Sequence, residues 1–319
     1  MLPDLTLDAV IERRRGRADP VDDRKLRSAL RRGQWHRVTP GAFVRGADWQ
    51  RLPPLERHRI LVLETMRRLR HPAIISHFAA AALWRIDVLG RWPDTVDVSS
   101  PPAGGGRSSG LIRRRVRAVD ELEVVAIGDH LVTTPAQTAL DLARTEPFVN
   151  GVAVVDQAIG TARTRGPLTT RDDILRLQER QAAARGSVRA RRVLSFANPL
   201  AANVRESQSR VVIAQLGFPM PRLQERRVLP SGRVVFGDIY FPAPDDHWCE
   251  IDGRGKYLSP EFGAHRDPAA IVIDEKNREN ETRRQVRGFS RWEATDADDP
   301  RRIWDILTGD GLRCPLPRP

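Results

Sequence analysis

The amino-acid sequence predicts a mixed protein, α+β in its first part and α/β-like in its last. Three observations lead to this fold class. Residues 22–44 read as a helix followed by two short strands, residues 204–307 read as helix, three strands, helix, strand and helix, and the charge is divided unequally between these regions. The 319 residues suffice for two or three domains. We expect domains at 1–52, 53–190 and 204–319, with a linker at 191–203.

The charge is the most informative number of the composition. The chain has 53 Lys and Arg against 41 Asp and Glu, a net charge of +12. Residues 204–319 carry 19 side chains of each sign, so the whole excess lies in residues 1–203. A basic region of this kind favours contact with a polyanion such as nucleic acid. A solvated basic surface in an arginine-biased genome is the alternative.

The composition also excludes several classes of protein. The longest apolar stretches, such as residues 78–84, are far shorter than the roughly 20 residues that span a bilayer. Acidic residues interrupt residues 2–12, where a signal peptide would have its apolar core. Cys249 and Cys314 are the only cysteines, which excludes a disulfide framework or a cysteine zinc site. We therefore expect a cytoplasmic protein with no membrane partner.

The first 45 residues have the pattern of a winged helix. A short helix is predicted over residues 4–15, and a second over residues 22–32 that ends at Gly33. Pro40-Gly41 forms a turn between two short strands. Helices followed by a hairpin are typical of winged helix-turn-helix proteins, although any helix with a hairpin fits. The side chains expected to contact DNA phosphates are Arg31, Arg32, Arg37 and Arg45.

The middle region predicts both helices and strands. The expected helices are 54–71, 76–84, 133–143, 148–160 and 170–185, and the expected strands are 95–99, 111–116 and 122–127. We expect Asp141 on the polar side of its helix, and His77 packed in the core or against a partner. Residues 186–203 are basic and loosely patterned, which predicts a linker that ends at Asn198-Pro199.

The C-terminal region places carboxylates near the ends of its predicted elements. Glu206 lies in the first turns of a helix, and Asp238 lies near the end of the second strand. Glu250 and Asp252 share a face of the third strand, because strand side chains alternate. Converging carboxylates repel one another unless a cation lies between them, and such ligands suit Mg²⁺ or Mn²⁺. The alternative is that these are ordinary helix-start, turn and edge residues.

A phosphodiesterase also needs a cation that stabilises the charge developing on the scissile phosphate. Only three lysines are present, and two of them, Lys256 and Lys276, lie near the carboxylates. On its predicted helix, Lys276 is expected to turn toward the carboxylates while Arg278 points elsewhere. A solvated helix face with local ion pairs is the alternative.

At these residues the sequence resembles the PD-(D/E)XK nucleases, and most closely the small domains related to the very-short-patch-repair endonuclease. Those domains carry E-(F/Y/I)-D-G, then K-Y, then E-K-x-R-E. This chain reads Glu250-Ile251-Asp252-Gly253, then Lys256-Tyr257, then Glu275-Lys276-Asn277-Arg278-Glu279. The likeness covers residues 203–308. It implies a restriction-endonuclease-like core of order αβββαβ.

The resemblance also implies roles for individual residues. Glu206, Asp238 and Glu250 would hold Mg²⁺ or Mn²⁺. Asp252 stands where the family has the catalytic lysine of its E-x-K motif. The role of that lysine then passes to Lys256 or Lys276, or the site is inactive.

The first part of the chain resembles the AbiEi family of type IV antitoxins. The likeness spans residues 5–190 and rests on the winged-helix pattern, on residues 74–84 (IISHFAAAALW) and on residues 132–143 (VTTPAQTALDLA). It implies a DNA-binding autorepressor of a toxin–antitoxin operon, with a cognate toxin protein as partner. The preference for Arg over Lys is consistent with a high-GC actinobacterium.

Two functions from different classes follow. One is an enzyme, a magnesium-dependent endodeoxyribonuclease that binds double-stranded DNA through its basic N-terminal region and hydrolyses it with the C-terminal carboxylates. The other is an antitoxin-like DNA-binding transcriptional autorepressor whose nuclease-fold domain is inactive. An RNA-directed nuclease is a third hypothesis, although no residue pattern points to recognition of the 2′-hydroxyl.

Overall fold

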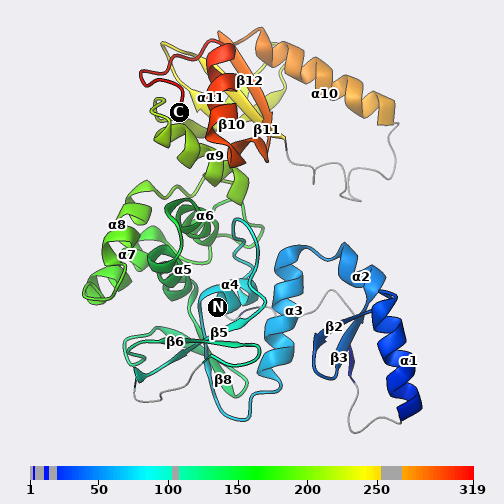
Figure 1. Ribbon diagram of the computed structural model, residues 1–319. Helices are drawn as coiled ribbons and strands as arrows, with labels where there is room; N and C mark the ends of the chain where they lie inside the picture. Colours follow the sequence, from blue (N-terminus) through cyan, green and yellow to red (C-terminus); the bar gives the residue numbers. More distant parts are fainter. Residues whose placement is uncertain (1–2, 4–10, 14–19, 103–107, 253–267) are drawn as a thin grey trace. The chain divides into compact units, whose positions relative to one another are not determined.

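The structure is a computed structural model that describes residues 3, 11–13, 20–102, 108–252 and 268–319, without the side chains of 20–22 and 268–273 (Figure 1). The chain divides into two compact units. The N-terminal unit contains residues 1–159 and 167–197, and the C-terminal unit contains residues 160–166 and 198–319. Both units combine helices with strands, so the predicted α+β class is confirmed at this level.

The N-terminal unit begins with the predicted helix and hairpin. Helix α1 (Pro20–Arg31) is followed by strands β2 (Trp35–Thr39) and β3 (Ala42–Arg45). Gly33 ends the helix region with a positive φ of 69°, a conformation that glycine adopts without strain. The hairpin packs over a small apolar core that contains Val38 and Val44.

Strand β1 (Glu12–Arg13) completes this sheet in the order β1-β3-β2. Glu12 pairs with Phe43 and Arg13 with Ala42, so the helix predicted over residues 4–15 is wrong at these two positions. Backbone pairing with β3 outweighs the local helical preference of the segment. Residues 4–10, 14 and 15 lie outside the described residues.

The rest of the N-terminal unit contains a five-stranded sheet in the order β6-β5-β4-β8-β7. Its strands are β4 (Ile74–Ile75), β5 (Val96–Ser100), β6 (Ile112–Val116), β7 (Val124–Ile127) and β8 (His130–Thr133). The pairs β4–β8 and β5–β6 are parallel, and the pairs β4–β5 and β7–β8 are antiparallel. Strands β4 and β8 were not predicted, because β4 has only two residues and the last residue of β8, Thr133, was placed in the helix predicted over residues 133–143.

The helices of this unit lie close to their predicted positions. They are α2 (Gly46–Arg51), α3 (Pro54–Met66), α4 (His77–Leu83), α5 (Pro135–Thr145), α6 (Phe148–Ile159), α7 (Arg171–Arg180) and α8 (Ser187–Phe196). Helices α2 and α8 were not predicted. Helix α8 occupies part of the expected linker because Ala190, Val193 and Leu194 form a buried stripe at helical spacing. Among the described helices, none is long and apolar enough to cross a membrane.

The C-terminal unit has the predicted order of elements (Figure 1). They are α9 (Val204–Gln215), β9 (Arg222–Val228), β10 (Val234–Phe241), β11 (His247–Asp252), α10 (Pro268–Arg283), β12 (Gly288–Glu293) and α11 (Pro300–Gly309), with a 3₁₀ turn at Asp296–Asp298. The sheet order is β12-β11-β10-β9. Strand β12 runs parallel to β11, and the other neighbours are antiparallel.

The two faces of this sheet carry different side chains. One face contributes Cys249 and Ile251 to an apolar core with residues of α9 and α11, among them Ile213 and Ile303. Trp248 belongs to a second cluster on the other face. Because side chains alternate along a strand, Glu250 and Asp252 share the face of Trp248. Helix α9, which carries Glu206, therefore covers the opposite face.

Candidate functional site

The four arginines predicted to contact DNA lie on α1 and on the hairpin, and all four are exposed. Arg31 is the last residue of helix α1 and Arg32 follows it, while Arg37 and Arg45 lie on β2 and β3. Trp35 pairs with Arg45 and Arg37 pairs with Phe43, so Arg37 and Arg45 project from one face of the hairpin. None of the four forms an ion pair with a carboxylate in the part of the chain that the structure describes.

Arg32 contacts two neutral side chains. Arg32 donates hydrogen bonds to the Ser28 Oγ at 2.5 Å and to the Gln34 Oε1 at 3.2 Å. His36, on β2, stacks on Trp49 with the ring centroids 4.0 Å apart. Burial and the charge of Arg57 lower the pKa of His36, so its imidazole is neutral at pH 7. The positive charge of this surface is therefore carried by guanidinium groups.

Glu206 lies in the first turn of its helix, beside the N-cap residue Asn203. Its Oε2 accepts a hydrogen bond from the Ala202 backbone N–H at 2.8 Å and one from the Gln224 Nε2 at 3.3 Å. Its Oε1 accepts a hydrogen bond from the Asn203 Nδ2 at 2.6 Å. The side chain is only 4% exposed. Asn203 in turn accepts hydrogen bonds from the backbone N–H groups of Arg205 and Glu206 in the first turn. Glu206 therefore supports the N-cap residue, which is a structural role.

Asp238 joins two strands. Its Oδ2 accepts a hydrogen bond at 2.8 Å from the backbone N–H of Ile251 in β11, next to the point where the regular pairing of β10 with β11 begins at Ile239. The carboxylate therefore takes the place of a backbone carbonyl at this point of the sheet.

Glu250 and Asp252 each form a bidentate ion pair with an arginine. Arg278 of α10 contacts both oxygens of Glu250, Nη1 to Oε1 at 3.1 Å and Nη2 to Oε2 at 3.3 Å. Arg291 of β12 contacts both oxygens of Asp252, Nε to Oδ2 at 2.5 Å and Nη2 to Oδ1 at 2.7 Å. Planar guanidinium groups match carboxylates in this way. Arginines, and not Lys276, form these described pairs with the two carboxylates.

Arg291 is also paired with two acidic residues of α10. Its Nη1 lies 2.7 Å from the Glu279 Oε2, and its Nη2 lies 3.4 Å from the Glu275 Oε1. The hydrogen bond to Asp252 is the main reason why the pKa of Arg291 is raised. Burial raises the pKa of Glu279, but hydrogen bonds and charges of Arg283 and Arg291 outweigh it and hold that pKa below its usual value.

The lysines do not take the expected positions where the structure describes them. Lys276 is exposed, whereas Arg278 reaches Glu250, so the expected orientation of these two side chains is wrong. The reason is helix geometry, because Arg278, Glu279 and the buried Thr282 come three, four and seven residues after Glu275 and so lie along one side of α10. Lys256 lies outside the described residues.

The described residues do not fit a Mg²⁺ or Mn²⁺ site in this arrangement. In residues 20–252 and 268–319, apart from the gap at 103–107, no three His, Cys, Asp or Glu side chains are placed to hold one ion. The oxygens that a metal would need accept hydrogen bonds from backbone amides, amide side chains or guanidinium groups instead. Glu206 also belongs to the helix on the face opposite to Glu250.

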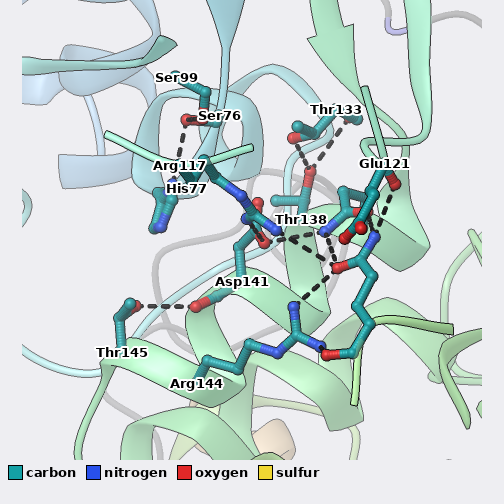
Figure 2. Close-up of polar contacts among 12 residues, drawn as sticks. Ser76, His77, Ser99, Arg117, Glu121, Thr133, Thr138, Asp141, Arg144 and Thr145 are labelled. Atoms are coloured by element: carbon teal, nitrogen blue, oxygen red, sulfur yellow. Dashed lines mark hydrogen bonds and ion pairs between the residues drawn. The ribbon is translucent and has the colours of Figure 1, made fainter. Parts of the chain in front are cut away.

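A buried polar layer in the N-terminal unit is a feature that the sequence analysis missed (Figure 2). Arg117 donates to the Oδ1 of Asp141, and the Gln137 Nε2 donates to the same oxygen at 2.9 Å. Arg144 donates to the Oε1 of Gln181 at 2.7 Å. Asp141 is only 1% exposed, so its expected place on the polar side of α5 is wrong. The arginine partner permits this burial by neutralising the carboxylate.

The same layer continues along the sheet. The Ser99 Oγ donates to the Ser76 Oγ at 2.9 Å, and Ser76 is 3.0 Å from the Nδ1 of His77 (Figure 2). His77 is 4% exposed, which confirms the expected packed histidine, and burial lowers its pKa. Arg113 and Arg115 of β6 both pair with Asp97 of β5. The sequence did contain a signal for this layer. Arg113, Arg115 and Arg117 occupy every second position, which places the three side chains on one face of the extended segment.

No protein-family model matches the sequence. Over 164 residues the chain is 34% identical to two uncharacterized proteins of Mycobacterium tuberculosis, one from strain CDC 1551 / Oshkosh and one from strain ATCC 25618 / H37Rv. The matched part is 51% of this chain and 54% of each relative. The chain thus spans about half the length of the curated relatives it matches, and their names state no activity.

Proposed function

We propose that the chain is a DNA-binding protein of the antitoxin-like repressor kind, which holds duplex DNA through Arg31, Arg32, Arg37 and Arg45. We further propose that its C-terminal unit, in the described arrangement, does not cleave DNA. One observation carries both statements. Many arginines of the C-terminal unit form ion pairs with carboxylates, whereas Arg31, Arg32, Arg37 and Arg45 form none with a described residue.

The C-terminal unit neutralises many of its arginines internally. The ion pairs include Arg205–Asp298, Arg227–Asp246, Arg233–Asp274, Arg278–Glu250, Arg291–Asp252 and Arg318–Asp305. An arginine in such a pair must give up its partner before it can bind a phosphate. Arg31, Arg32, Arg37 and Arg45 have no ion pair with a described carboxylate to give up, so they can neutralise DNA phosphates and release counterions directly.

The alternative is the metal-dependent endonuclease. It requires Glu250 and its neighbours to exchange guanidinium partners for a metal ion, and the bidentate pair with Arg278 opposes that exchange. Residues 253–267 belong to the same proposed site and lie outside the described residues. A toxin partner and a cytoplasmic location rest on the resemblance and the composition alone, and both stay predictions.

The first experiment measures binding of a fluorescent duplex taken from the promoter region upstream of the gene. The test variant combines Arg31→Ala, Arg37→Ala and Arg45→Ala. The control combines Arg91→Ala, Arg176→Ala and Arg180→Ala, which removes three arginines of the same unit that are ion-paired with Asp94, Asp173 and Glu123. The net charges of the two variants are equal. We expect the test variant to lose at least about tenfold in affinity and the control to stay close to wild type. Equal losses in both variants would disprove a specific role for the hairpin.

The second experiment incubates supercoiled plasmid with the full-length protein and Mg²⁺ or Mn²⁺. Wild type and Glu250→Ala are compared. We expect no nicking by either protein. Nicking by wild type that Glu250→Ala lacks would replace the proposal with the endonuclease.

A further inference from the structure

We infer that helix α8 carries a second contact surface for duplex DNA, separate from α1 and the β2–β3 hairpin. This α8 surface consists of three exposed arginines on the helix and just before it, Arg185, Arg191 and Arg192. The inference rests on the proposed function for the kind of partner, because it extends DNA binding to another part of the N-terminal unit. Its experiment measures the two surfaces separately, so that either can fail while the other stands.

The segment around α8 has no negative side chain of its own. Glu179 and Glu206 are the nearest acidic residues on either side, and the residues between them include six arginines. Arg185, Arg191 and Arg192 form no ion pair and no side-chain hydrogen bond with any residue that the structure describes. Their charge is therefore uncompensated within the described part of the chain, and a polyanion is the complementary partner.

The spacing of residues along α8 shows that these charges are not arranged to stabilise the helix. An acidic side chain three or four positions away in either direction would neutralise the adjacent pair Arg191 and Arg192. The exposed positions that both arginines share at that spacing hold Val188 and Ser195 instead. Two ion pairs on other helices of the chain have this spacing, Arg176–Asp173 and Arg283–Glu279.

The helix dipole does not account for the arginines either. Cations stabilise a helix at its last turn, and the last turn of α8 contains none. Arg185 precedes the first turn and Arg189 lies in it, at the end of the helix where positive charge is unfavourable. Arg189 has a structural role there, because its Nη1 donates to the carbonyl oxygens of Thr145 and Glu146 at 3.2 Å each. The other charges have no favourable partner within the described chain.

The structure holds α8 and one of its arginines in place. Ala190, Val193 and Leu194 are fully buried and fix the helix against α5, α6 and α7. The guanidinium of Arg192 lies over the ring of Phe148 in α6, 4.5 Å from the ring centroid. Such a stack uses the face of the guanidinium and leaves its N–H donors, which lie in its plane, available to a phosphate. An arginine held in this way loses less side-chain freedom on binding.

The composition of the helix surface favours nucleic acid over a protein partner. The centre of a protein interface is typically apolar and rich in aromatic side chains and methionine. Among the residues of α8, only Val188 is a large apolar side chain that is exposed. Arginine and serine side chains are common donors to DNA phosphates, and α8 exposes both. The 10 residues of the helix extend over about 15 Å, and a duplex presents several phosphates along that length.

The test measures how tightly the full-length protein binds a fluorescent duplex of random sequence at several salt concentrations, because phosphate contacts do not depend on the base sequence. Glutamine replaces arginine, since it removes the charge and keeps a similar helix propensity. The α8 variant combines Arg185→Gln, Arg191→Gln and Arg192→Gln. We expect it to lose at least about tenfold in affinity and about 2 in the slope of log K against log salt.

Two further variants separate the effect of charge from an effect on folding. The control replaces three ion-paired arginines of the same unit and has the same net charge as the α8 variant: Arg91→Gln, Arg176→Gln and Arg180→Gln. It should bind close to wild type. The lysine variant keeps the charge of the α8 surface: Arg185→Lys, Arg191→Lys and Arg192→Lys. It should also bind close to wild type, because an ammonium group binds phosphate as a point charge.

The variant Arg31→Ala, Arg37→Ala and Arg45→Ala, measured on the same duplex, distinguishes this inference from the proposed function. A loss of affinity in that variant alone would overturn the inference and leave the proposed function intact, and a loss in the α8 variant alone would do the reverse. A lysine variant that binds as weakly as the glutamine variant would also overturn the inference, because the charge would then not be the cause. Fluorescent polyglutamate is the second probe. An α8 variant that loses affinity for polyglutamate but not for the duplex would assign the surface to an acidic protein and overturn the inference.

Discussion

The carboxylate of Asp97 accepts two hydrogen bonds from the guanidinium of Arg113, at 2.5 Å from Nε and 2.7 Å from Nη2. A third comes from the Nε of Arg115 at 2.7 Å. The parallel register of β5 and β6 places Asp97 beside Arg113 and Ser99 beside Arg115. Burial raises the pKa of Asp97, but these hydrogen bonds and charges outweigh it, so the pKa lies below its usual value. The carboxylate is therefore ionised in the interior of the sheet.

This relationship predicts a large loss of stability for Asp97→Ala. The change leaves two partly buried guanidinium groups without their carboxylate, which we expect to lower the free energy of unfolding by about 3–5 kcal/mol. Asp94→Ala is the control, because Asp94 pairs with Arg91 at an exposed position and should cost less than about 1 kcal/mol. Urea denaturation of both variants measures the difference. Equal midpoints would contradict a structural role for the buried pair.

The partners of Glu250 and Asp141 show which features of the structure could be predicted from the sequence and which could not. The order of elements followed from hydrophobic periodicity and from glycine and proline positions, which act locally. The partner of Glu250 did not, because Lys276 and Arg278 are both cations near the same motif, and only the orientation of the helix against β11 selects Arg278. The burial of Asp141 likewise depends on Arg117, which lies 24 residues away, directly after strand β6.

The carboxylates themselves were placed correctly at a helix start and on two strands, yet their positions did not reveal their partners. Glu206 bonds to the backbone of its own cap region, and Asp238 bonds to the next strand. Such contacts depend on side-chain orientation, which sequence spacing does not specify. A motif that resembles a metal site therefore needed the three-dimensional contacts before its chemistry could be judged.

The lowered pKa of the buried His58 leads us to expect that the stability of the protein depends on pH. It is 3% exposed beside Trp92, and burial lowers its pKa to about 4. The unfolded state, with a pKa near 6.5, therefore binds a proton before the folded state does. The stabilising contribution of neutral His58 is complete above about pH 6.5 and is lost as the pH falls toward 4, at up to roughly 1.4 kcal/mol per pH unit.

Urea denaturation at pH 7.5 and pH 5 measures this loss. His58→Phe keeps an aromatic ring but cannot bind the proton, so we expect a smaller loss between the two pH values than in wild type. His71→Gln is the control, because His71 is exposed and its replacement should leave the wild-type difference unchanged. A His58→Phe variant with the full wild-type loss would show that other groups cause the pH dependence.

The hairpin arginines predict a change in the salt dependence of DNA binding. The slope of log K against log salt falls by about 0.9 for each phosphate contact that is lost. We expect Arg37→Ala with Arg45→Ala to reduce the slope by about 2, uniformly across duplex sequences. Fluorescence anisotropy at several salt concentrations measures the slope. Arg91→Ala, at an ion-paired exposed position, should leave it unchanged, and an unchanged slope in the hairpin variant would rule out phosphate contacts there.

At Gly46 the backbone after the hairpin lies close to the backbone after α1, and this close approach leads to a prediction for the variant Gly46→Ala. Its backbone N–H donates to the Gln34 carbonyl oxygen at 2.8 Å, and a Cβ at this position would lie 1.8 Å from the carbonyl oxygen of Gly33. The backbone fixes the position of that Cβ, and the oxygen it meets is a backbone atom, so no rotation of a side chain can relieve the clash. Gly46→Ala must therefore displace the segment that carries Arg45 relative to the helix that carries Arg31 and Arg32.

We expect Gly46→Ala to lower the free energy of unfolding by more than about 2 kcal/mol and to weaken DNA binding together with it. Gly309→Ala is the control, since a Cβ there meets no atom within 4 Å in helix α11. Alanine is favoured over glycine inside helices by up to about 1 kcal/mol, so this control should be neutral or slightly stabilising. Urea denaturation measures the free energy of unfolding, and fluorescence anisotropy on the same samples measures the affinity for DNA. If Gly46→Ala kept wild-type stability and affinity, the close approach of the two backbone segments would not fix the arrangement of the four arginines, and each would have to reach DNA through the flexibility of its own side chain.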